Sequence, residues 1–143
     1  MRLSSALRPL AIMAALLAAS ACHSSATTTP TPAKNAAPTK PAAVTAANVA
    51  MGDSIFNNGS CARCHGKGGV GAQNAPALDG KKWLQLKTGS FDEIVGIITS
   101  GVPAANIKDP SHKNAMGARG GRMALTDPQI TAVAAYVYTL SHK

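Results

Sequence analysis

The sequence predicts an all-α fold that encloses a bound group, and three observations lead to this prediction. Apolar residues repeat at helical spacing behind two typical helix starts, whereas no stretch alternates apolar and polar residues as a half-buried strand would. Only 3% of the 143 residues are aromatic. Small domains with so little bulk often rely on a disulfide, a metal or a cofactor to complete the core.

The first 22 residues, MRLSSALRPLAIMAALLAASAC, have the pattern of a signal peptide. Arg2 and Arg8 precede an apolar run that is shorter than the roughly 20 residues of a transmembrane helix. Ordinary signal cleavage and a bacterial lipoprotein signal would both cut before Cys22. The odd number of cysteines favours a lipid on Cys22, because the other two form a pair. We therefore predict a signal peptide over residues 1–21.

Residues 22–50 are predicted to form a flexible tether, anchored by lipid at Cys22. They are rich in Ala, Thr, Ser and Pro, with only Lys34 and Lys40 charged, and they show no apolar periodicity. The folded domain is then expected over residues 51–143. It has ten Lys and Arg against six Asp and Glu, a net charge of +4 that favours acidic partners. A nucleic-acid partner is not expected, because the basic residues are scattered and form no known binding motif.

The first helix of the domain is expected to be short. Ile55 and Phe56 supply its apolar side chains, and Asn58 and Gly59 favour its end. The sequence CARCH follows directly at residues 61–65 and is expected to form a helical turn.

Two capping boxes predict two more helices. Ser-Phe-Asp-Glu at residues 90–93 precedes an apolar stretch that should be helical to Ser100. Thr-Asp-Pro-Gln at residues 126–129 starts a final helix with one apolar face, which should run to about Leu140.

Long glycine-rich segments over residues 66–89 and 101–125 separate these helices. Segments of over twenty residues without periodicity are unusual in a small domain unless they are functional. We expect them to wrap around the bound group.

The chemistry of CARCH decides what that group is. A zinc site needs about four ligands, and the chain has no second spaced pair. A redox dithiol is typical of a βαβ pattern, which is missing, and a plain disulfide would not need the histidine. The motif C-x-x-C-H is typical of covalent haem attachment. A helical turn places Cys61, Cys64 and His65 on one face, so we interpret them as the two thioether anchors of one haem c and its proximal iron ligand.

With these residues the chain from Met51 to about Ser141 resembles a small class I c-type cytochrome with a single haem. The resemblance also rests on Gly52 and Phe56 in the first helix, on Ala-Pro-Ala-Leu at residues 75–78, and on the ending LTDPQITAVAAYVYTLS. It implies the class I cytochrome c fold, with three to four helices around one covalently bound haem. The first and last helices would cross beside it.

The resemblance further implies a methionine as the sixth ligand of the iron. The pattern Met-Gly-Ala-Arg-Gly-Gly that begins at Met116 fits the family, although Gly117 stands where a proline is frequent. Met123 is a weaker candidate, because it lies close to the last helix and is expected to pack there. His112 and His142 are expected to be solvated surface residues.

Supporting roles are also implied by position. Pro76 resembles the family proline whose carbonyl accepts the proton of the haem histidine, here His65. Trp83 would pack against the haem, bond a propionate or merely fill the core. Gly52 and Tyr136 are expected at the helix crossing.

A His/Met pair leaves no open iron site, and the resemblance implies a single-electron carrier, not an enzyme. We expect it in the periplasm or cell envelope, anchored to the membrane by lipid and exchanging electrons with redox proteins. Two alternatives stay open: a haem-based ligand sensor or small haem enzyme with a displaceable sixth ligand, and a dedicated cytochrome subunit of an oxidase or dehydrogenase complex. Five basic residues would favour acidic partners: Arg63, Lys67, Lys81, Lys82 and Arg119.

Overall fold

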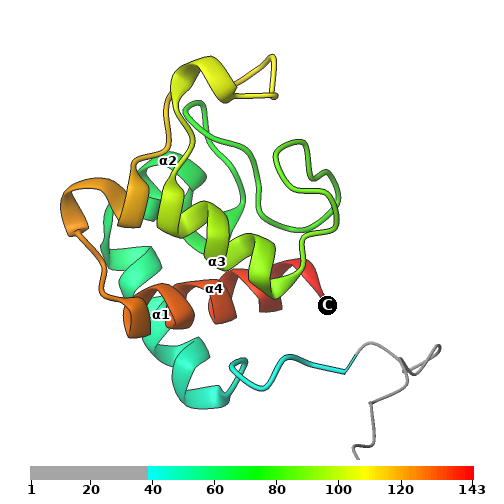
Figure 1. Cartoon of the computed structure of the whole chain (residues 1–143), viewed down its shortest axis with the longest axis vertical. Coiled ribbons are helices and arrows are strands. Elements are labelled where there is room, and N and C mark those ends of the chain that lie inside the picture. Colours follow the sequence, from blue (N-terminus) through cyan, green and yellow to red (C-terminus); the bar gives the residue numbers. More distant parts are fainter. Residues whose placement is uncertain (1–38) are drawn as a thin grey trace, which may run out of the picture. The chain divides into compact units, whose positions relative to one another are not determined.

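The computed structural model describes residues 39–143, and the predicted signal peptide, Cys22 and the tether up to residue 38 lie outside the described residues. Within the described part the fold is all-α, as predicted, with two isolated bridges and no strand. Figure 1 shows the helices and the long loops that connect them. In chain order they are α1 (Ala46–Asn58), α2 (Ser60–His65), η1 (Lys67–Gly69), α3 (Phe91–Ser100), η2 (Ala104–Asn106), η3 (Ala118–Met123) and α4 (Asp127–Ser141), where η denotes a 3-10 helix.

The first helix begins earlier than predicted. It starts at Ala46, inside the segment expected to be tether, and the side chain of Thr45 accepts a hydrogen bond from the backbone N–H of Asn48 at 3.1 Å. Val44 is only 4% exposed. The sequence AANVA lacks an apolar stripe, but alanine is the strongest helix former. Helix propensity therefore extends α1 where the apolar pattern gives no signal.

The crossing of α1 with α4 depends on a close approach of the two backbones. A Cβ atom on Gly52 would lie 2.0 Å from the carbonyl oxygen of Ala132 and 2.9 Å from Cβ of Tyr136. Gly52 and Tyr136 therefore meet at the crossing, as predicted. The rings of Phe56 and Tyr136 pack together there with centroids 5.4 Å apart.

The last helix is buried over more of its surface than the single apolar face that the sequence predicted. Its segment from Ala132 to Val137 is buried without interruption, and three alanines in it are 0% exposed. The reason is that α1 and α3 both pack against α4. Small side chains permit this double contact. Phe56, Ile94 and Ile130 are the largest fully buried side chains of the resulting core.

The two capping boxes form to different degrees. At α4 the predicted box is complete, and the backbone N–H of Thr126 donates to Oε1 of Gln129 at 2.9 Å. At α3 only half forms: the hydroxyl of Ser90 accepts from the N–H of Glu93, whereas the Glu93 carboxylate accepts from the preceding turn. Its donors are the backbone N–H groups of Lys87, Thr88 and Gly89 and the hydroxyl of Thr88.

These hydrogen bonds lower the pKa of Glu93 to about 2. The carboxylate therefore closes the turn before α3 while the helix start is capped by Ser90 alone.

The two long loops lie on the side of the domain where α2 and α3 are found (Figure 1). The second is closed at its base by an isolated bridge in which Val102 and Met116 exchange backbone hydrogen bonds of 2.8 and 2.9 Å. Gly101 has a φ of 68°, and a Cβ atom on it would lie 2.4 Å from the carbonyl oxygen of Met116. Only glycine fits at this position. Among residues 39–143, no helix has the length and apolar character needed to cross a bilayer.

Candidate functional site

A cavity of about 410 Å³ lies between α2, α3, α4 and the two long loops. Its volume falls within the roughly 300–1,000 Å³ of cofactor and ligand sites. Phe56, Ile94 and Leu125 contribute to its apolar wall. The cavity brings together all the described residues that the sequence predicted for cofactor binding, namely Cys61, Cys64, His65, Pro76, Trp83 and Met116.

The two cysteines lie on α2 at one side of this cavity. Cys61 is half-buried, Cys64 is exposed, and both are free thiols in the structure. Burial raises the pKa of the Cys61 thiol, and the neighbouring Cys64 adds to the rise. Within residues 39–143, no three His, Cys, Asp or Glu side chains converge as a metal site would require. Both cysteines line the cavity, where they can meet a group that enters it.

His65 ends α2 and is oriented by a single hydrogen bond. Its Nδ1 lies 2.9 Å from the carbonyl oxygen of Pro76. A carbonyl can only accept, so Nδ1 carries the proton and Nε2 keeps a free lone pair. Burial lowers the pKa of His65, the charge of His112 lowers it further, and the Pro76 bond opposes them. His65 is thus a neutral imidazole whose orientation suits metal ligation.

Asn57 ties this turn to the helix crossing, a role that sequence reasoning missed. The backbone N–H of Gly68 donates to Oδ1 of Asn57 at 2.8 Å, and Nδ2 of Asn57 donates to the hydroxyl of Tyr136 at 3.1 Å. One side chain therefore connects α1, α4 and the segment after His65. Its neighbours suggested only a helix end, and the sequence contains no signal for this contact with Tyr136.

Met116 and Met123 lie in different surroundings. Met116 is half-buried on the lining of the cavity. Met123 lies outside that lining, and its sulfur is 3.0 Å from the backbone nitrogen and 2.9 Å from the hydroxyl of Ser60. Sulfur is a weak acceptor, but this pairing holds Met123 against the start of α2. Of the two methionines, only Met116 faces the space where a cofactor fits.

His112 is not the solvated loop residue that the sequence predicted. It is half-buried and lines the cavity, with Nδ1 2.7 Å from a carboxylate oxygen of Asp109 and Nε2 3.2 Å from the carbonyl oxygen of Ala72. Ala72 is distant in sequence, so no local pattern revealed the contact. His142 is exposed, as predicted, and its ring stacks on Tyr138.

Trp83 is half-buried on the cavity lining. Gly89, with a φ of 73°, lies against its ring: a Cβ atom there would be 2.1 Å from the indole nitrogen. The loop thus leaves room for Trp83 to turn towards the cavity.

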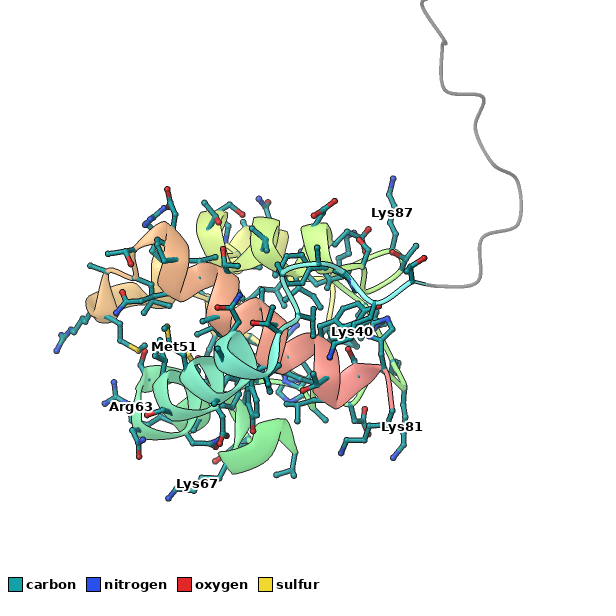
Figure 2. The ribbon with its side chains drawn as sticks, turned by 90° about the horizontal axis from the view of Figure 1, so that it is seen from below. Lys40, Met51, Arg63, Lys67, Lys81 and Lys87 are labelled. Carbon is teal, nitrogen blue, oxygen red and sulfur yellow. The ribbon has the colours of Figure 1, made fainter. Side chains whose placement is uncertain are left out.

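The five basic residues predicted for partner docking do not form one patch. Figure 2 shows Arg63 and Lys67 at the α2 side of the domain, well separated from Lys81. Lys81 pairs with Asp79 at 3.0 Å, and Arg119 donates to the carbonyl oxygen of Leu125 and to the carboxylate of Asp127. Arg119 therefore has a structural role. Three exposed cationic side chains border the cavity: Arg63, Lys82 and Arg122. Of these, Arg122 was not predicted from the sequence.

Comparison with known proteins gives consistent relationships. Residues 47–137 match the family described as cytochrome c oxidase, cbb3-type, subunit III. A cbb3-type cytochrome c oxidase subunit FixP of Bradyrhizobium diazoefficiens is 37% identical over 92 residues, which are 64% of this chain and 30% of that protein. The FixP subunit of Azorhizobium caulinodans is 38% identical over 82 residues, 57% of this chain and 26% of that protein. The chain thus matches less than a third of the length of these relatives.

The fold has a counterpart among solved structures. Cytochrome cL of the marine methylotrophic bacterium Methylophaga aminisulfidivorans superimposes with a TM-score of 0.54 at 21% identity. The match covers 69% of this chain and 57% of that one. This likeness confirms the predicted cytochrome c fold.

Proposed function

The chain belongs to the family of cytochrome c oxidase, cbb3-type, subunit III, and we propose that it is a single-electron carrier of the bacterial cell envelope. A cytochrome c domain implies covalently attached haem c. The observation that carries the proposal is one cavity whose lining contains a C-x-x-C-H turn and, from another loop, a methionine. That donor set would suit a haem whose iron is bound by one histidine and one methionine.

The roles of the residues follow from the chemistry of their side chains. Cys61 and Cys64 would form the two thioether bonds, and Nε2 of His65 and the sulfur of Met116 would bind the iron. Haem c supplies the one-electron couple between ferric and ferrous iron. Pro76 keeps His65 in the tautomer that can bind metal, because its carbonyl accepts from Nδ1. A thioether ligand raises the reduction potential.

The surroundings of Met116 favour a carrier over a ligand sensor. Its backbone is held on both sides by hydrogen bonds to Val102. A ligand carried on a fixed backbone supports electron exchange with little rearrangement, whereas a sensor needs a ligand that leaves. Met123 is engaged by Ser60, which supports Met116 as the iron ligand.

Redox proteins are the proposed partners. The relatives are named as oxidase subunits, so an oxidase is the proposed class of acceptor. The second candidate function is that of a dedicated subunit in such a complex. The two candidates differ in one measurement. A carrier purifies alone from detergent-solubilised membranes, whereas a subunit co-purifies with oxidase polypeptides in fixed ratio.

The envelope location includes a proposal on residues outside the described part of the chain. We propose that Cys22 carries a lipid, which would hold the domain at the periplasmic face of a membrane. Replacing Cys22 with Ala should move the protein from the membrane fraction to the soluble fraction. Unchanged membrane association would contradict the lipid anchor and leave the carrier function untouched.

The spectrum of the purified protein tests the main proposal. The haem should stay with the denatured polypeptide, and the oxidised protein should show the weak far-red absorption band of a methionine bound to ferric haem. Rapid binding of carbon monoxide to the reduced protein, without the far-red band in the oxidised form, would instead support the sensor.

A further inference from the structure

The loop that ends at Met116 forms a strap over the cavity. We use this name for residues 102–116, whose two ends are joined by the Val102–Met116 bridge. Such a compact loop with paired ends is an Ω-loop. It is the yellow segment beyond α3 in Figure 1, and side chains along it, including Ile107 and Asn114, line the cavity.

Side chains fasten the strap to the loop over residues 66–89 at two places. At the first, Nε2 of Gln85 donates to the carbonyl oxygen of Asn106 at 3.1 Å, and the backbone N–H of Lys108 donates to Oε1 of Gln85 at 3.1 Å. At the second, Nδ2 of Asn114 donates to Oδ1 of Asn74 at 2.9 Å, and His112 approaches Ala72. All the side-chain groups are neutral amides except His112, which can titrate.

Both nitrogens of the His112 ring face acceptors. Nδ1 lies 2.7 Å from a carboxylate oxygen of Asp109, within the strap, and Nε2 lies 3.2 Å from the carbonyl oxygen of Ala72, on the opposite loop. A neutral imidazole has one N–H and can donate to only one of them, whereas an imidazolium donates to both. The two contacts coexist as hydrogen bonds only when His112 is protonated.

We propose that His112 is a positioning residue that latches the strap over the cavity when it carries a proton. The proposal rests on the proposed function in one respect, that the cavity holds the haem. The sign follows from the bonds: the closed strap binds one proton more, so acid favours closure and the strap loosens as His112 loses its proton. Water then reaches that edge of the cavity.

Other titratable groups lie close to His112 in the structure or in the sequence. The hydrogen bond from His112 lowers the pKa of Asp109, with help from the N–H of Ser111 and the charge of Lys82, so this carboxylate stays ionised near neutrality. His65 is the proposed iron ligand, and the charge of His112 contributes to the lowering of its pKa. Lys108 and Lys113 flank the site in sequence.

Amide hydrogen exchange in the haem-loaded protein tests the latch. The amide of Lys108 bonds the opposite loop, so its protection reports strap closure, whereas the amides of Val102 and Met116 lie in the base bridge and serve as an internal reference. Between about pH 5 and about pH 9, after correction for intrinsic exchange, we expect Lys108 protection to fall about tenfold, which corresponds to about 1.4 kcal/mol. The reference amides should not follow it.

Three variants separate a latch from a merely structural contact. H112Q should show low Lys108 protection at every pH and no transition. D109N removes the carboxylate that favours the imidazolium, so its transition should move to lower pH. N114A is the matched control: it removes a neutral bond between the same two loops. Its protection should be lower at all pH values, with the transition where the wild type has it.

The reduction potential gives a second readout. Opening the strap admits water and removes a positive charge, and both favour the more highly charged oxidised iron. The potential of the wild type should therefore fall with rising pH more steeply than that of H112Q.

A wild-type strap without a pH transition, or an H112Q variant that keeps one, would overturn the latch. A missing far-red band would contradict ligation of the iron by Met116. It would not decide the latch, which the hydrogen-exchange data test separately.

Discussion

The crossing of α1 with α4 and the cavity beneath the strap are held together by different means. At the crossing, backbones touch across Gly52, and burial of small and aromatic side chains leaves no room for another atom. Around the cavity, hydrogen bonds from single side chains join the two long loops. The comparison shows that packing within the chain stabilises the crossing. The loops around the cavity, in contrast, leave a volume that we expect the bound cofactor to fill and stabilise.

The largest expected effect is the loss of covalent haem from the cavity. Replacing both Cys61 and Cys64 with Ala should abolish covalent haem attachment completely, because no other thiol lies in the described domain. Haem staining after denaturing electrophoresis measures it, and the single variants serve as controls that keep one thioether. Covalent haem in the double variant would show that attachment occurs elsewhere.

The next effect concerns the two methionines. Met116→Ala should remove the far-red band of the oxidised protein and lower its reduction potential, since the thioether that favours the reduced iron is gone. Met123→Ala should keep the band and cost about 1–2 kcal/mol of stability, because it removes half-buried contacts with Ser60. Absorption spectra and denaturant titrations of both variants measure this. Loss of the band in Met123→Ala alone would reverse the assignment.

A pair of glycine substitutions tests the close packing at the crossing of α1 with α4. Gly52→Ala should destabilise the domain by about 1–3 kcal/mol, because its Cβ atom would collide with the backbone of α4. Gly96→Ala is the matched control within a helix: nothing lies within 4 Å of the added atom, so we expect up to about 1 kcal/mol of stabilisation. Denaturant unfolding of the haem-loaded protein measures both. Equal effects would show that the crossing is less tight than the structure indicates.

The smallest expected effect lies at an exposed turn. The pKa of Glu93 is lowered from 4.5 to about 2, so its contribution to stability is present above about pH 4.5 and is lost as the pH falls towards 2. Glu93→Gln should therefore lower stability near neutrality and weaken its dependence on acid. Acid unfolding followed by circular dichroism tests it. Asp92→Asn, in the same turn, should leave the acid dependence closer to that of the wild type.

The features that the sequence predicted are those with local causes. The starts of α3 and α4 follow from caps within a few residues, and the C-x-x-C-H turn is one contiguous motif. The beginning of α1 was missed because its alanines form a helix without an apolar stripe. His112 and Asn57 were missed because their partners are 40 and 79 residues away in the chain. Long-range polar contacts produce no periodic pattern in the sequence. The hydrogen bonds that join the loops around the cavity are therefore seen only in the structure.

The bridge between Val102 and Met116 has a consequence for how this loop can change over evolution. Because the two residues pair directly, the segment between them can gain or lose residues while Met116 keeps its place on the cavity. Gly101 secures this arrangement, since a side chain there would push into the Met116 carbonyl. We therefore expect that the strap can be replaced without moving Met116. Replacing residues 103–115 with a short turn should alter access to the cavity and preserve the far-red band.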